Sequence, residues 1–138
     1  MEKIFSKVQP GLLLHMIVRS KDFTMSRQDV IDPNNFLQCA IKRMREGETF
    51  RSHKHIETPV TYETRKTQES WIMLRGVIRC TLFDINDTFL VKPVLKAGDM
   101  CITLHGGHTF TVLEDDSCMI EIKTGPYEGV SKDKMFIL

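Results

Sequence analysis

The sequence predicts an all-β protein of one domain, folded as an antiparallel sandwich or barrel. Short stretches of apolar or alternating residues recur roughly every 8–12 positions, and turn residues separate them. No helical period extends over roughly 15 residues, and only a turn of helix near the C-terminus fits such a pattern. A chain of 138 residues is long enough to bury a core within a single domain.

The expected strands follow in order along the chain. The first, at residues 11–19, would pack on the outside of the barrel or against a second subunit, and a turn at Asp32-Pro33-Asn34 follows it. Residues 1–34 are therefore expected to form N-terminal strands, or an arm, that packs on the barrel or on a dimer partner. Residues 35–138 are expected to form the barrel itself. Strands of the barrel are predicted at residues 35–44, 49–55, 69–75, 77–83, 89–95, 100–104, 109–113 and 118–123.

Charge and composition argue against several classes of partner. Nineteen basic and eighteen acidic residues leave a net charge of +1, without a basic tract or an acidic tail. Neither nucleic acid nor a membrane surface is therefore an expected partner. No apolar run approaches the roughly 20 residues that cross a bilayer, and the first residues lack the pattern of a signal peptide. We expect a soluble cytoplasmic protein.

The four cysteines are expected to be structural. Cys39, Cys80, Cys101 and Cys118 are widely spaced and lie in apolar or alternating stretches. Buried reduced thiols fit this pattern better than disulfides or zinc ligands do.

A pair of histidines is the first indication of chemistry. His53 and His55 are two positions apart in a predicted strand, so both side chains project from one face together with Arg51. Two imidazoles on one face could bind a single metal ion, although such a pair alone is weak evidence.

A carboxylate strengthens the prediction of a metal site. Glu69 begins a predicted strand in which Glu69, Trp71 and Met73 share one face. A carboxylate beside such apolar side chains loses hydration, which favours a compensating cation or hydrogen bonds. Glu57, two residues after His55, is the alternative carboxylate, although Pro59 follows it closely.

The remaining histidines differ in their settings. His108 follows Gly106-Gly107, a pair that lets the backbone turn sharply and direct the next side chain inward. His105 precedes the same turn and is expected at the rim, where its imidazole could act as an acid or base near the metal. His15 has no identifiable partner and is assigned a structural role.

These residues together resemble the two sequence motifs of the cupin superfamily, over roughly residues 35–123. The resemblance implies a double-stranded β-helix barrel and one divalent transition metal, Fe, Mn, Ni or Zn. It also implies that the ligands are His53, His55, Glu69 and His108. The first motif corresponds to Gly47, His53, His55, Glu69 and Gly76, and the second to Gly98, Asp99, Gly106, Gly107 and His108.

The chain departs from the cupin pattern at two places. Thirteen residues separate His55 from Glu69, where the family has three or four, which implies an extended loop at the barrel mouth. In the second motif Leu104 replaces the usual proline, and one residue fewer precedes His108. The third imidazole could therefore be either His105 or His108.

Several residues are candidates for ligand binding. Arg51 could bind a carboxylate or phosphate, and the loop cations Arg65 and Lys66 could reach a sugar-nucleotide diphosphate. Tyr62 could serve as an aromatic wall or a proton donor, and Trp71 is expected to contact the ligand beside Glu69.

A narrower similarity suggests the biological context. The segments at residues 67–71, 106–108 and 121–127 resemble small cupin metalloproteins associated with bacterial surface-polysaccharide biosynthesis. The first hypothesis is accordingly a metal-dependent isomerase or epimerase acting on a sugar or sugar-nucleotide. An iron-dependent dioxygenase and a non-catalytic module that binds a small molecule are the alternatives. We also expect a homodimer, bridged by residues 12–18.

Overall fold

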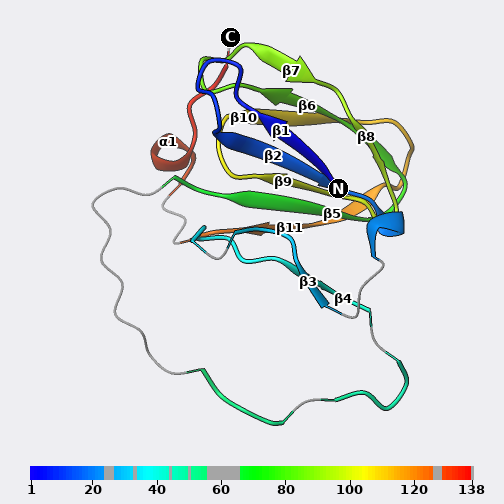
Figure 1. Cartoon of the computed structure of the whole chain (residues 1–138). Coiled ribbons are helices and arrows are strands. Elements are labelled where there is room, and N and C mark those ends of the chain that lie inside the picture. The colour runs from blue at the N-terminus through cyan, green and yellow to red at the C-terminus, as the bar shows by residue number, and fades with distance from the viewer. Residues whose placement is uncertain are drawn as a thin grey trace.

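The computed structural model is all-β, as predicted, and is built from three antiparallel sheets (Figure 1). It describes residues 1–23, 27–32, 34–43, 45–49, 51–55, 66–125 and 129–137. The larger sheet contains, in spatial order, β1 (Glu2–Phe5), β2 (Leu13–Val18), β9 (Met100–Thr103), β5 (Glu69–Arg75) and β11 (Cys118–Lys123). The second contains β10 (Gly107–Val112), β6 (Val77–Phe83) and β7 (Phe89–Val91), and β8 (Val94–Lys96) also pairs with β6. A small outer sheet pairs β3 (Arg27–Asp29) with β4 (Ala40–Lys42).

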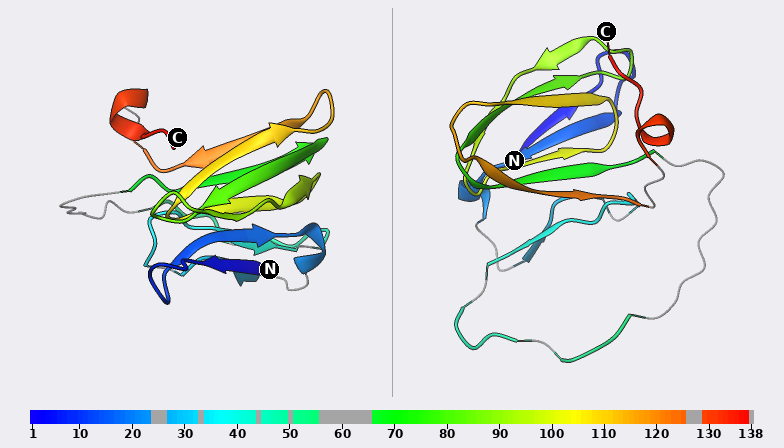
Figure 2. Two further views of the ribbon diagram at one scale, coloured as in Figure 1. Left: turned by 90° about the horizontal axis from the view of Figure 1, so that it is seen from above. Right: turned by 180° about the vertical axis from the view of Figure 1, so that it is seen from behind.

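The two larger sheets face each other and enclose the main core (Figure 2). Where only one face of a strand packs on this core, alternate residues are buried, which is the period of two that the sequence shows. In β6, for example, Ile78, Cys80 and Leu82 are buried whereas Arg79 between them is exposed. The buried residues of this core are Ile17, Trp71, Met73, Ile78, Cys80, Leu82, Leu95 and Cys101.

A second core covers the outer face of the five-stranded sheet. Val30, Ile31, Leu37 and Ile41, from the small sheet and its flanking segments, pack there against β2 and β9. Strand β2 is therefore buried on both faces and lies between β1 and β9. Residues 12–18, which we expected to bridge to a second subunit, instead lie mostly in the core of their own chain.

Two polar side chains secure the N-terminal strands to the four-stranded sheet. Asp84, at the end of β6, accepts hydrogen bonds from Ser6 Oγ (2.7 Å) and the backbone N–H of Lys7 (2.6 Å). His15 in β2 is fully buried, and its Nε2 lies 3.0 Å from the carbonyl of Phe83. Because a carbonyl only accepts, Nε2 must carry the proton. These contacts bring β1 and β2 into the same sandwich as β6.

Three predicted strands differ from the observed ones in more than one or two end residues. The strand expected at residues 89–95 is divided into β7 and β8, on either side of Pro93. Residues 35–44 were expected to form one strand, but only Ala40–Lys42 is extended and paired. Residues 51–55 form no strand, so the strand predicted at residues 49–55 is wrong in this structure. The side chains of residues 51–55 are all exposed, and alternation alone does not make a strand without a partner to pair with.

The remaining elements are short. A 3₁₀ turn spans Ser20–Asp22, and α1 (Val130–Asp133) lies near the C-terminus. Neither of these helices, found within the described residues, has the length needed to cross a bilayer. All four cysteines are free thiols, and Cys80 and Cys101 are buried between the two sheets.

Candidate functional site

Glu69 and His108 meet between the two sheets at one end of the sandwich. Glu69 begins β5, where it lies between Thr103 of β9 and Lys123 of β11 in the strand register. His108 comes from β10 in the opposite sheet. The Oε1 atom of Glu69 is 3.6 Å from Nε2 of His108, and the two side chains are 7% and 22% exposed. Residues 39 positions apart in sequence thus form a largely buried acid–imidazole pair.

The glycine pair before His108 explains why its ring points inward. Gly106 has φ of +79°, and a Cβ there would overlap the carbonyl oxygen of Phe83. Only glycine adopts this conformation at that distance without strain. The turn then sets the register of β10, in which His108 lies opposite the buried Leu82 and therefore faces the interior.

The imidazole of His108 has no hydrogen-bond partner in the part of the chain that the structure describes. Its Nδ1 is buried without one, and its Nε2 is too far from Glu69 for a hydrogen bond. Burial, with a smaller contribution from His15, lowers the pKa of His108 from 6.5 to about 4. The ring is therefore neutral near pH 7, and its one unprotonated nitrogen has a lone pair available to a metal.

The charged form of Glu69 is also disfavoured by its surroundings. Burial raises its pKa above the usual range, and the negative charge of Glu121 adds to the shift. The nearby indole N–H of Trp71 acts in the opposite direction and lowers the pKa of Glu69. Because His108 is neutral, it does not supply the positive charge that would offset the carboxylate.

Trp71 forms the apolar wall of the site. It is two residues from Glu69 on the same face of β5, and its indole N–H donates to Glu121 Oε2 at 3.4 Å. The indole contacts the ring of His108 edge-on, with centroids 4.7 Å apart, and that of Phe110 at 5.1 Å. These contacts hold the His108 ring beside Glu69 and exclude water from one side of it.

The donors that are present suit a divalent metal. A buried carboxylate and a neutral imidazole with unsatisfied nitrogens are what Fe, Mn, Ni or Zn sites use. A cation there would compensate the desolvated charge of Glu69 and engage a nitrogen of His108. Within the described residues, however, no group of three or more His, Cys, Asp or Glu is placed to hold an ion.

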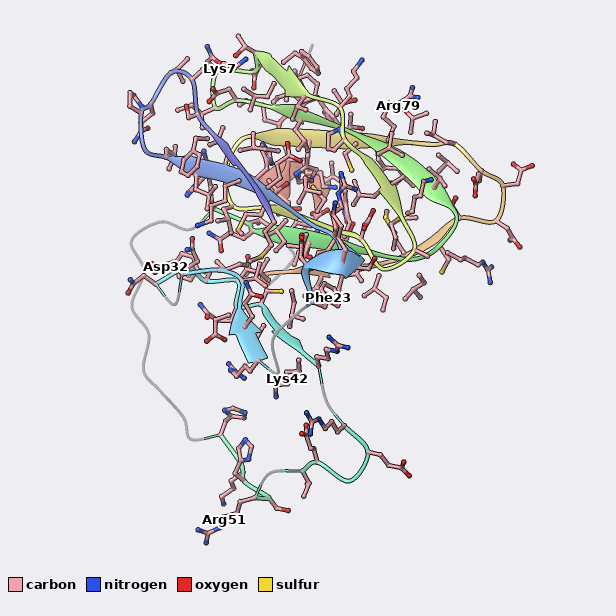
Figure 3. The ribbon with its side chains drawn as sticks, turned by 45° about the vertical axis from the view of Figure 1, so that its right-hand side comes forward. Lys7, Phe23, Asp32, Lys42, Arg51 and Arg79 are labelled. Atoms are coloured by element: carbon pink, nitrogen blue, oxygen red, sulfur yellow. The ribbon has the colours of Figure 1, made fainter. Side chains whose placement is uncertain are left out.

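The structure does not bring the predicted histidine pair to this site. The rings of His53 and His55 contact each other edge-on, with centroids 5.5 Å apart, on an exposed segment. Figure 3 shows Arg51, on the same segment, well away from the two sheets. The predicted residues Glu57, Tyr62 and Arg65 lie outside the described part of the chain.

The other candidate residues lie around the site or in the core. His105 is partly buried after β9, and its pKa is lowered first by burial and then by the charge of Lys66. His15 is hydrogen-bonded to Thr103 (3.1 Å) and to Phe83, which agrees with the structural role expected for it. Of the two histidines that flank the glycine pair, His108 is the one that faces Glu69.

Two residues near the site were not identified from the sequence. Glu121 lies opposite Trp71 in the register of β11 and β5, which places it on the inward face. The charge of Lys134, after α1, lowers the pKa of both Glu69 and His108. Alternation in β11 could have indicated the inward face of Glu121, whereas no sequence signal placed Lys134.

Comparison with known proteins gives no family assignment. No protein-family model matches the chain, and no significant match was found among curated proteins or solved structures.

Proposed function

We propose that this chain is a cupin-type protein that binds one divalent transition metal at Glu69 and His108. The observation that carries the proposal is the buried, neutral and unpartnered imidazole of His108 beside a desolvated carboxylate. Each group is unfavourable in isolation, and a cation between them would stabilise both. The two facing antiparallel sheets support the finer proposal that the fold is a double-stranded β-helix.

The open edge of β10 supports a role for the histidine pair. Strand β10 is the outermost strand of its sheet among the described residues, with β6 on one side only. We propose that residues 51–55 pair with this edge when metal binds. His53 and His55 share one face of an extended chain, and the register that turns this face inward would place both on the same side of the sheet as His108.

The proposed ligand set is His53, His55, Glu69 and His108. A divalent ion held by these donors would supply a Lewis acid that polarises a bound carbonyl or hydroxyl oxygen. Phe110, which is 37% exposed and contacts Trp71 edge-on, provides an apolar surface against which a sugar ring would lie. His105, on the far side of the glycine pair, would be placed to accept or donate a proton.

For the reaction, we propose isomerisation or epimerisation of a sugar or sugar-nucleotide. This part of the proposal depends on the resemblance of residues 67–71, 106–108 and 121–127 to cupins of surface-polysaccharide biosynthesis. A panel of sugar nucleotides incubated with metal-loaded protein, with product stereochemistry followed by NMR, tests it directly. Turnover that persists after complete metal removal would contradict the proposal.

Metal binding is tested by calorimetric titration of the metal-free protein with Zn²⁺. We expect one zinc site. Glu69→Gln and His108→Ala should each lower zinc affinity by more than about 100-fold, because mutating residues that only hydrogen-bond to metal ligands already lowers affinity about 10–100-fold. Glu114→Gln, a substitution of an exposed acid beyond β10, is the matched control and should leave the affinity unchanged. The His53→Ala variant tests the histidine pair separately. Equal zinc affinity in wild type and His108→Ala would refute the proposed site.

A further inference from the structure

The C-terminal segment crosses the end of the sandwich at which Glu69 and His108 lie. It runs from α1, near the start of β5, past the ends of the strands to the C-terminus near β7 (Figures 1 and 2). We call residues 129–137 the C-terminal strap. Its path brings it alongside both sheets, although none of its residues belongs to a strand.

Contacts on both sides of the site hold the strap in place. Asp133 accepts a hydrogen bond from Thr67 Oγ1 at 2.8 Å and forms an ion pair with Lys123 at 3.2 Å. Thr67 is two residues before Glu69, and Lys123 is the cross-strand partner of Glu69. The strap is thus fastened directly beside the carboxylate of the site.

The other fastening is beside His108. The side chain of Ile137 packs so closely on Gly107 that a Cβ at that position would overlap it. Gly107 therefore has a packing role in addition to its place in the turn before His108. Since Asp133 and Ile137 are fixed at either side, the residues between them must span the entrance between the two sheets.

Lys134 is the cation in this span. Its side chain is exposed and forms no hydrogen bond or ion pair with the described residues. Its charge nevertheless acts on the carboxyl of Glu69 and on the ring of His108, which places the ammonium within electrostatic reach of both. Lys123, by contrast, is already neutralised by Asp133.

We propose that Lys134 binds an oxyanion group, a phosphate or a carboxylate, of a small ligand that enters beneath the C-terminal strap and reaches the metal. This inference rests on the proposed metal site and specifies its ligand class. An ammonium whose backbone is anchored near the entrance attracts and orients such a group, and its donors are available because no partner among the described residues occupies them. The anchors of Asp133 and Ile137 make Lys134 a positioned cation and not an ordinary surface lysine.

The test is calorimetric titration of Co²⁺-loaded protein with inorganic phosphate and, separately, with oxalate, with metal content measured after each titration. We expect the Kd for at least one anion to rise about tenfold in Lys134→Met, the loss of one charge-assisted contact. Lys134→Arg should restore most of the affinity. Lys96→Met, which removes an exposed lysine at the end of β8, is the control and should stay within about twofold of wild type.

A strap variant separates placement from charge. Ile137→Ala retains Lys134 and changes no charge but weakens the anchor of the strap on Gly107, and it should also reduce anion affinity while leaving metal content unchanged. Equal anion affinity in wild type and Lys134→Met, or no binding of either anion to wild type at millimolar concentration, would overturn the inference.

Failure of the metal site itself would give a different result. In that case wild-type protein takes up no Co²⁺. The metal-free wild type and Lys134→Met are then titrated with the same anions. Weaker binding by Lys134→Met would support the anion site and contradict only the metal site.

Discussion

The metal-free protein should lose stability in acid because of His108. The pKa of this residue falls from 6.5 to about 4 in the folded state, where burial opposes the charged form. The folded state therefore binds fewer protons than the unfolded state between these two values, and stability falls as the pH is lowered from 6.5 towards 4. A shift of this size corresponds to about 3 kcal/mol, at about 1.4 kcal/mol for each pH unit. The ring is only 22% exposed, so solvent screening removes little of this effect.

The assay is urea unfolding in the presence of a chelator, followed by the fluorescence of Trp71, the single tryptophan, and by far-UV circular dichroism. We compare wild type with His108→Asn, which cannot titrate, at several pH values from 7.5 to 4. Glu69 acts in the opposite direction, because a raised pKa makes its protonation stabilising as pH falls. It is present in both proteins, as is His15, so the difference between the two curves isolates His108. Parallel pH curves for the two proteins would refute the burial of this ring.

Three further predictions concern the core, the turn and the metal. Leu82→Ala, which removes a fully buried side chain between the sheets, should lower the free energy of unfolding by about 2–5 kcal/mol in urea titrations. Gly106→Ala should cost at least about 1–2 kcal/mol because of its positive φ, and should displace His108; a variant as stable as wild type would contradict the turn geometry. Zinc at 100 times its Kd should add about 2.7 kcal/mol to wild type, measured as a rise in Tm. Glu69→Gln should abolish that gain, and a similar rise in both proteins would place the zinc elsewhere.

The sequence was most informative where strands alternate and glycines or turns bound them. Three strands were predicted with the observed bounds, at Glu69–Arg75, Val77–Phe83 and Cys118–Lys123. The residues of these strands that face the core must be apolar, so apolar residues recur at every second position of the sequence. Strands β1 and β3 were missed because they are short and largely exposed, and their pairing partners define them.

Only part of the candidate site could be predicted from the sequence in the same way. The shared face of Glu69 and Trp71 follows from alternation along one strand, and the inward direction of His108 follows from the glycine pair. Glu121 and Lys134 depend on which strands pair and on where the C-terminal strap runs, which are tertiary contacts without a local signal. The strand predicted at residues 49–55 rested on the alternation of His53 and His55, whereas in the structure residues 51–55 form no strand and are exposed.

Anomalous scattering from crystals grown with Zn²⁺ tests the central claim most directly, because it locates the ion and its ligands together. We expect a single strong peak between the carboxylate of Glu69 and the ring of His108, with His53 and His55 drawn to the same ion. A peak elsewhere on the chain, or crystals in which Glu69 and His108 remain without zinc at saturating concentration, would contradict the proposed metal site.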